Sequence, residues 1–168
     1  GEYDGELGRA RGILTGYENL IPIPTPMFRL TVSAFSKQSN IYVEGWHSLK
    51  PYRIGIIRGI LLTEKYTEGM NRYQAVNAMQ MFRMLDAGRF DIAVTIKLVG
   101  LLTLKQLNIK GVRVLAPPLM KNEVLHYVHE KHRDLIPILS DIFFQMEQSG
   151  RIEALTNEYV QNIKRQIQ

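Results

Sequence analysis

The sequence contains no cysteine, which excludes disulfide bonds, thiolate zinc ligands and cysteine nucleophiles together. No apolar run approaches the roughly 18 residues that a membrane-spanning helix needs. No basic-then-apolar leader opens the chain, which starts with Gly1 in place of Met. Because the first eight residues are typical of the end of a structural unit, we expect that a leader, a larger segment or both preceded them.

Concentrated charge is also lacking. Lys and Arg number 21 against 16 Asp and Glu, a formal charge of +5, yet no run of five or six basic residues occurs. Proteins that bind nucleic acid gather their basic residues on one face, so we expect no nucleic-acid partner. A hydrophobic share of 45% against 22% charged residues is ordinary for a folded globular chain.

What the sequence does contain is an alternation of short β-rich runs with helical patterns, which is typical of a parallel α/β architecture. The predicted strands are residues 53–57, 73–76, 90–96 and 112–115. The predicted helices are residues 63–70, a segment through Met79, Phe82 and Leu85, and residues 98–107. Repeated strand-helix units of this kind place ligand crevices at the carboxyl ends of the strands.

Longer helical periods follow towards the C-terminus. One apolar face is made by Leu135, Leu139, Ile142, Phe143 and Met146, and a second by Ile152, Leu155, Tyr159 and Ile163. Gly88 and Gly150 stand where left-handed caps end helices. Residues 28–35 and 123–128 are two further predicted strands, one before and one after the central block, and we expect them to be crossings between two lobes.

Six segments, in this order and spacing, resemble the type II periplasmic binding proteins, in particular the polar amino acid receptors of ABC transporters. They are GEYDG at residues 1–5, FRLTVSAFSK at 28–37, WHSLK at 46–50, YRIGIIRG at 52–59, MLDAGRFDIAV at 84–94 and QSGRIE at 148–153.

The resemblance implies the α/β type II periplasmic-binding-protein fold, with the second lobe complete and the first lobe partial. It assigns residues 1–36 to the end of lobe 1 and the outgoing crossing strand, 37–118 to lobe 2, and 119–168 to the return crossing and the C-terminal helices of lobe 1. The implied function is an extracytoplasmic or periplasmic protein that captures a small polar or anionic solute for an ABC-type transporter. Its expected partners are that small-molecule ligand, a membrane permease and, because lobe 1 is incomplete, further copies of the chain. The alternatives are the input domain of a membrane signalling protein and, less favoured, an enzyme on the same fold.

In this family the second lobe offers a glycine turn and a helix N-terminus to an anionic group, and residues 55–60 correspond to that turn. Free N–H groups and the helix dipole favour an anion there, and the Arg58 side chain adds charge. Three departures from the family pattern argue against an ordinary α-amino acid. They are Ile60 in place of a hydroxyl residue, Ile96 and then Lys97 in place of an acid, and Tyr17 in place of the lobe-one arginine, for which Arg9 and Arg11 are substitutes. The expected ligand-binding set is Glu6, Arg9, Arg11, Arg58, Gly59, Ile60, Thr95 and Lys97, with Glu6 equally able to act as a cap or to pair with Arg9.

Neither catalysis nor a bound metal is predicted. The chain has no nucleophile elbow, phosphate-binding lysine loop or recognisable carboxylate pair, so we expect a protein that is not an enzyme and uses no cofactor. His126, His129 and His132 are three residues apart, but a run from strand into helix does not bring their rings together. We therefore expect no metal site.

Overall fold

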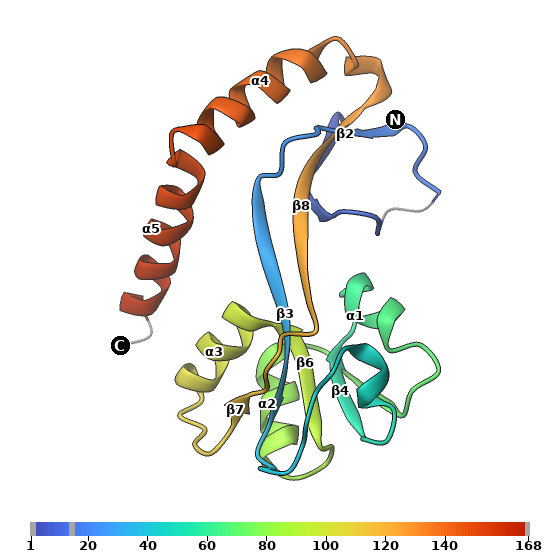
Figure 1. Cartoon of the computed structure of the whole chain (residues 1–168), viewed down its shortest axis with the longest axis vertical. Helices are drawn as coiled ribbons and strands as arrows, with labels where there is room; N and C mark the ends of the chain where they lie inside the picture. Colours follow the sequence, from blue (N-terminus) through green and yellow to red (C-terminus); the bar gives the residue numbers. More distant parts are fainter. Residues whose placement is uncertain (1–2, 14–15, 167–168) are drawn as a thin grey trace. The chain divides into compact units, whose positions relative to one another are not determined.

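The chain described by the computed structural model, residues 3–13 and 16–166, divides into two units. Unit 2 is Thr31–Lys121, and unit 1 combines the chain before Thr31 with the chain from Asn122 to Gln166. Strands β3 (Phe28–Ser36) and β8 (Met120–His129) carry the chain from one unit to the other (Figure 1). The chain passes from unit 1 to unit 2 after Leu30, within β3, and it returns after Lys121, within β8. Both crossing strands are therefore shared between the units.

Unit 2 is built on a sheet with the strand order β3-β6-β4-β5. Strand β4 (Ile54–Ile57) pairs in parallel with both β5 (Arg72–Ala75) and β6 (Ile92–Ile96). Strand β3 is antiparallel to β6, and the short β7 (Arg113–Val114) pairs antiparallel with β3. The strands predicted in the central block are confirmed, and the parallel arrangement predicted for it holds for three of them.

The helices of unit 2 are η1 (Trp46–Leu49), α1 (Leu61–Tyr66), α2 (Ala78–Asp86) and α3 (Lys97–Gln106). The three α-helices confirm the predicted segments, although α1 is shorter than residues 63–70. Helix α2 begins where the Asn77 side chain accepts a hydrogen bond from the Gln80 N–H at 2.9 Å. After α2 the chain turns at Gly88, whose φ of 68° is the left-handed conformation that a cap requires.

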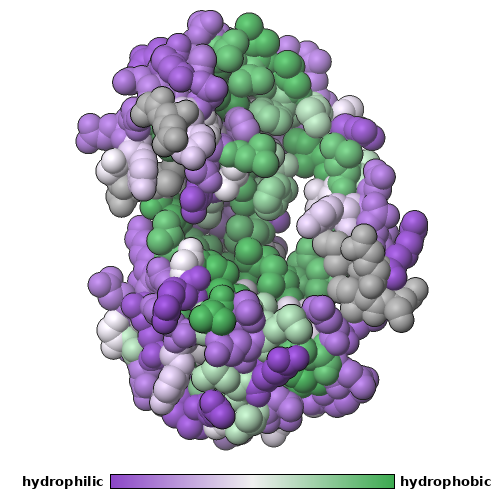
Figure 2. All heavy atoms as spheres, turned by 180° about the vertical axis from the view of Figure 1, so that it is seen from behind, coloured by the Kyte–Doolittle hydropathy of each residue, from purple (hydrophilic) through white to green (hydrophobic). Residues whose placement is uncertain are grey.

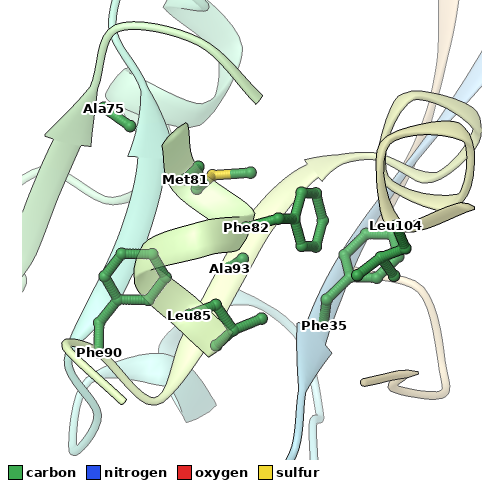
Figure 3. Packing of buried hydrophobic residues seen from close by; sticks show 8 residues of the cluster. All are labelled: Phe35, Ala75, Met81, Phe82, Leu85, Phe90, Ala93 and Leu104. Carbon is green, nitrogen blue, oxygen red and sulfur yellow. The ribbon is translucent and has the colours of Figure 1, made fainter. Parts of the chain in front are cut away.

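The main cluster of buried apolar side chains in unit 2 lies between the sheet and α2 and α3 (Figure 3). Phe35 of β3 meets Phe82 of α2 edge to face, with ring centroids 5.3 Å apart. Ala93 of β6 and Leu104 of α3 complete this contact from the sheet and from the second helix. The helical spacing of apolar residues in the sequence therefore identifies the face of α2, with Phe82 and Leu85, that packs on the sheet.

Unit 1 consists of strands around β8 and two C-terminal helices. Strands β1 (Gly5–Ala10) and β2 (Leu20–Pro22) both pair antiparallel with β8, and neither was predicted. After η2 (Glu130–His132) come α4 (Leu135–Gln148) and α5 (Arg151–Gln166), as predicted. Gly150, with a φ of 71°, joins these two helices. Gly1 and Glu2 of the first matching segment and the side chain of Ile163 lie outside the described part.

Helix α4 is strongly apolar, yet none of its side chains is buried. Leu135, Ile138, Ile142 and Phe144 are 40%, 58%, 45% and 53% exposed. Figure 2 shows apolar side chains gathered at the α4 end of unit 1. In the described ranges, no helix has both the length and the apolar character to cross a bilayer.

Candidate functional site

The carboxyl ends of β4 and β6 are neighbours in the sheet of unit 2, and they mark its topological switch point. From β4 the chain runs through α1 to β5 on one side, then returns through α2 to β6 on the other side. In open α/β sheets, ligands bind outside the carboxyl ends of the strands where the strand order reverses in this way. The candidate site is therefore the edge formed by the residues that follow β4 and β6.

Two cationic side chains lie at this edge. Arg58 directly follows β4 and Lys97 directly follows β6, and both residues are exposed. Neither side chain makes a hydrogen bond or an ion pair with any described residue. Like charges on neighbouring strands repel each other unless an anion or solvent lies near them. The edge is thus suited to a negatively charged or strongly polar partner.

The backbone N–H groups of the glycine turn are not free, which corrects the expectation of an anion site built on them. The Arg58 N–H donates to the Ala75 carbonyl at 2.9 Å, and the Ile60 N–H donates to the Ile57 carbonyl at 3.3 Å. The Gly59 N–H donates to Glu64 Oε1 at 2.8 Å. The structure thus offers the Arg58 side chain, and not its backbone, at this point.

Thr95, a predicted ligand contact, lies at the end of β6 but is fully buried. Its hydroxyl has no hydrogen-bond partner among the described residues, and the same is true of the buried Ser33 hydroxyl on β3. Ser33 lies directly opposite Thr95 in the β3–β6 ladder. Thr95 is consequently part of the interior of unit 2 and is not exposed beside Arg58 and Lys97.

The predicted residues of unit 1 have partners inside that unit. Arg9 Nε donates to Glu6 Oε1 at 3.0 Å, which confirms the alternative that Glu6 pairs with Arg9. Arg11 donates to Glu123 Oε2 at 2.8 Å and to the Pro24 carbonyl at 3.3 Å. A ligand would have to compete with these carboxylates for either guanidinium group.

The three histidines lie in different local settings. His126 Nδ1 is 2.8 Å from the Leu7 carbonyl, and His132 Nε2 is 2.9 Å from Asp4 Oδ1. His129 Nδ1 accepts a hydrogen bond from the Lys131 N–H at 3.2 Å. Within residues 3–13 and 16–166, no group of three or more His, Cys, Asp or Glu side chains is placed to hold a metal ion.

Sequence reasoning missed two features of unit 2. One is Glu64 in α1, whose carboxylate accepts the hydrogen bond from the Gly59 N–H. An acidic residue in the first turn of a helix can reach back to the N–H groups just before the helix, so its position five residues after Gly59 was a usable signal. The other is a stack of Trp46 on Tyr66, with ring centroids 4.9 Å apart and planes inclined by 16°. Trp46 belongs to η1 and Tyr66 ends α1, so only the folded chain brings the two rings together.

Solved structures show which class of fold this is. The chain matches a histidine kinase sensor domain with similarity to periplasmic binding proteins at a TM-score of 0.73 and 16% identity, over 92% of this chain and 68% of that one. It matches the GluR0 ligand-binding core in complex with L-glutamate at 0.73 and 10% identity, over 86% and 66%. It matches AbpA, an amino acid ABC transporter substrate-binding protein from Streptococcus pneumoniae bound to L-arginine, at 0.68 and 10% identity, over 94% and 66%. The chain therefore has the predicted type II periplasmic-binding-protein fold.

A relative found by sequence comparison is longer than this chain. A protein of Shewanella oneidensis is 28% identical over an alignment of 163 residues, and the match covers 91% of this chain and 61% of that protein. No family model matches the chain. The chain thus spans about six-tenths of this relative's length and about two-thirds of the chains in the solved structures.

Proposed function

We propose that this chain is part of a protein that binds a small polar or anionic solute without transforming it, and that the ligand contacts the edge after β4 and β6. The observation that carries the proposal is the presence of two exposed cations, Arg58 and Lys97, without side-chain partners at a topological switch point. Gly59 and Ile60 follow Arg58 and supply van der Waals surface. Ile96 stands where amino acid receptors have an acid, so a cationic ligand has no partner there.

The favoured role is that of an extracytoplasmic or periplasmic solute-binding protein that delivers its ligand to an ABC-type permease. The fold supports it, because AbpA, with the same fold, is a transporter substrate-binding protein. The second candidate is the ligand-sensing input domain of a membrane signalling protein. It is favoured by the match to a histidine kinase sensor domain, which covers 92% of this chain. An enzyme on this fold has less support, since none of these matched structures is described as one.

Binding measurements on the full chain test the ligand class. L-glutamate, succinate, L-glutamine and L-arginine are titrated by calorimetry into the wild type and into Arg58→Ala and Lys97→Ala. We expect binding of an acidic or neutral probe, weakened at least tenfold by each substitution, because each one removes a charge-assisted hydrogen bond. Lys110→Ala removes an exposed cation away from both strand ends and is the matched control. Binding of L-arginine alone, unchanged in both variants, contradicts the proposal.

We also propose that the 168-residue chain associates with itself through α4. The α4 surface is apolar and unburied within unit 1, and the chain spans about two-thirds of the length of the structures that share its fold. Exposed apolar patches of this kind mark interaction surfaces. Sedimentation velocity should show a concentration-dependent dimer that Ile138→Lys dissociates, while Glu153→Lys on α5 leaves it intact. A wild type that stays monomeric over the whole concentration range measured contradicts this proposal.

A further inference from the structure

Two buried hydroxyl groups face each other across the sheet of unit 2. Ser33 on β3 and Thr95 on β6 are directly opposite residues of an antiparallel pair. Ser33 is 1% exposed and Thr95 is 0% exposed. Neither hydroxyl oxygen has a hydrogen-bond partner among the described residues. Both oxygens are therefore removed from bulk water at one point of the sheet without compensation from the protein.

The side of the sheet on which they lie follows from the register. Phe35 pairs with Ala93 two residues further along the same ladder, and alternate residues of a strand point to the same face. Phe35 and Ala93 belong to the apolar cluster between the sheet and α2 and α3 (Figure 3). Ser33 and Thr95 thus extend this core face, where a hydroxyl without a partner is costly.

The usual spacing of directly opposite residues allows one oxygen atom to bridge the two hydroxyl groups. Directly opposite residues of an antiparallel pair have Cβ atoms about 4.5–5.5 Å apart. Two hydroxyl oxygens that do not bond each other at that spacing can each bond a third oxygen at about 2.7–2.8 Å. Buried waters in proteins occupy such positions, because they make two to four hydrogen bonds to groups that otherwise have none.

We propose that Ser33 and Thr95 together bind one buried water molecule that bridges β3 and β6. The site does not depend on the proposed solute-binding function. It assigns Thr95 to the interior of unit 2, and it connects β6, which ends at the candidate edge, to the strand through which the chain enters this unit.

A double-mutant cycle tests the site in the full chain. Ser33→Ala and Thr95→Val each remove one hydroxyl at nearly constant shape and leave the water and the other hydroxyl short of a partner. We expect each single variant to lower the Tm by about 2–6 °C. The double variant should lose much less than the sum, because no hydroxyl then remains unpaired.

A control pair and a crystal structure complete the test. Thr103 is also buried, but its hydroxyl donates to the Val99 carbonyl at 2.8 Å, so Ser33→Ala and Thr103→Val should be additive. Electron density at high resolution should show an oxygen atom within about 3 Å of both hydroxyls. Three results would overturn the proposal: single variants that raise the Tm, additive effects at residues 33 and 95, or a direct bond between the two hydroxyls.

Discussion

The carboxylate of Asp91 accepts several hydrogen bonds in unit 2. Its carboxylate accepts from the Arg53 N–H at 2.9 Å, from Arg53 Nη2 at 2.9 Å and from Gln38 Nε2 at 3.1 Å. The Arg53 side chain also donates to the carbonyls of Gly88 and Arg89. The hydrogen bond from the Arg53 side chain is the largest cause that holds the pKa of Asp91 below its usual value, and the bonds from the Arg53 N–H and from Gln38 act in the same direction. Asp91 thus ties the start of β4 to the turn that leads into β6.

Replacing this carboxylate should destabilise unit 2. We expect Asp91→Ala to reduce the free energy of unfolding by about 1–3 kcal/mol, because it leaves several donors without an acceptor. Urea denaturation followed by circular dichroism measures the change. The control is Asp86→Ala, which removes an exposed ion pair with Lys37 and should cost less than about 1 kcal/mol. Equal losses in the two variants would show that the Asp91 network adds nothing beyond a surface pair.

Asp4 provides a pH-dependent prediction in unit 1. Hydrogen bonds from His132 and then Lys131 lower the pKa of Asp4 to about 2 from 3.8. Because the pKa of Asp4 is lower in the folded chain than in the unfolded chain, the contacts of its carboxylate with His132 and Lys131 stabilise the fold fully above about pH 4. That contribution is lost as the pH falls from about 4 through 2. Asp4→Asn should therefore lose less stability than the wild type over this interval in pH-dependent urea denaturation, whereas two parallel curves would contradict the assignment.

At the scale of whole elements, apolar patterns predicted the segments with a buried face. Helix α2 was predicted because Met79, Phe82 and Leu85 recur at helical spacing, whereas the strands of residues 53–115 and helix α3 were predicted from short runs of branched and apolar residues. Strand β1 was missed because it has few apolar residues, and all of its residues are half-buried or exposed. It is a strand because it pairs with β8, which follows it by more than a hundred residues.

Some features of the candidate site could likewise be predicted from the sequence, and others could not. The position of Arg58 and Lys97 after two strands could be predicted, because both strands were visible in the sequence. Their adjacency depends on the strand order, which sequence reasoning did not fix. The Gly59 N–H cannot bind an anion because it donates to Glu64, and this contact depends on the rotamer of the Glu64 side chain. The burial of Thr95 depends on which face of β6 the helices cover, and the pattern of an apolar strand does not reveal that face.

The N-terminus of α2 permits a prediction for a single element. Asn77 Oδ1 accepts from the Gln80 N–H, and Gln80 Oε1 accepts from the Val76 N–H at 2.8 Å, so two N–H groups at this helix start are satisfied reciprocally. We expect Asn77→Ala to lower the stability of the chain by about 1 kcal/mol. Asn77→Asp keeps an acceptor and should stay within a few tenths of a kcal/mol of the wild type in thermal denaturation. A loss as large in Asn77→Asp would show that the cap is not the cause.

Across the molecule, burial is unevenly distributed between elements of the same kind. Helix α2 buries Met81, Phe82 and Leu85, whereas α4 buries no side chain although it is longer and more apolar. The strands β4 and β6 are almost entirely buried. Local opening is easiest where few apolar contacts hold an element. The stability of unit 2 and that of the C-terminal helices should therefore differ.

Amide hydrogen exchange of the dilute full chain, followed by mass spectrometry, measures this difference. We expect the slowest exchange in β4 and β6, intermediate exchange in α2, and exchange at least tenfold faster in α4 than in α2, because α4 has no buried side chain to hold it closed. At high protein concentration, protection of α4 should rise while that of α2 stays constant, since only α4 is covered when copies associate. In Ile138→Lys the concentration dependence should disappear. Protection of α4 equal to that of α2 at every dilution would show that unit 1 holds this helix by itself and that its apolar face is not the surface through which copies of the chain meet.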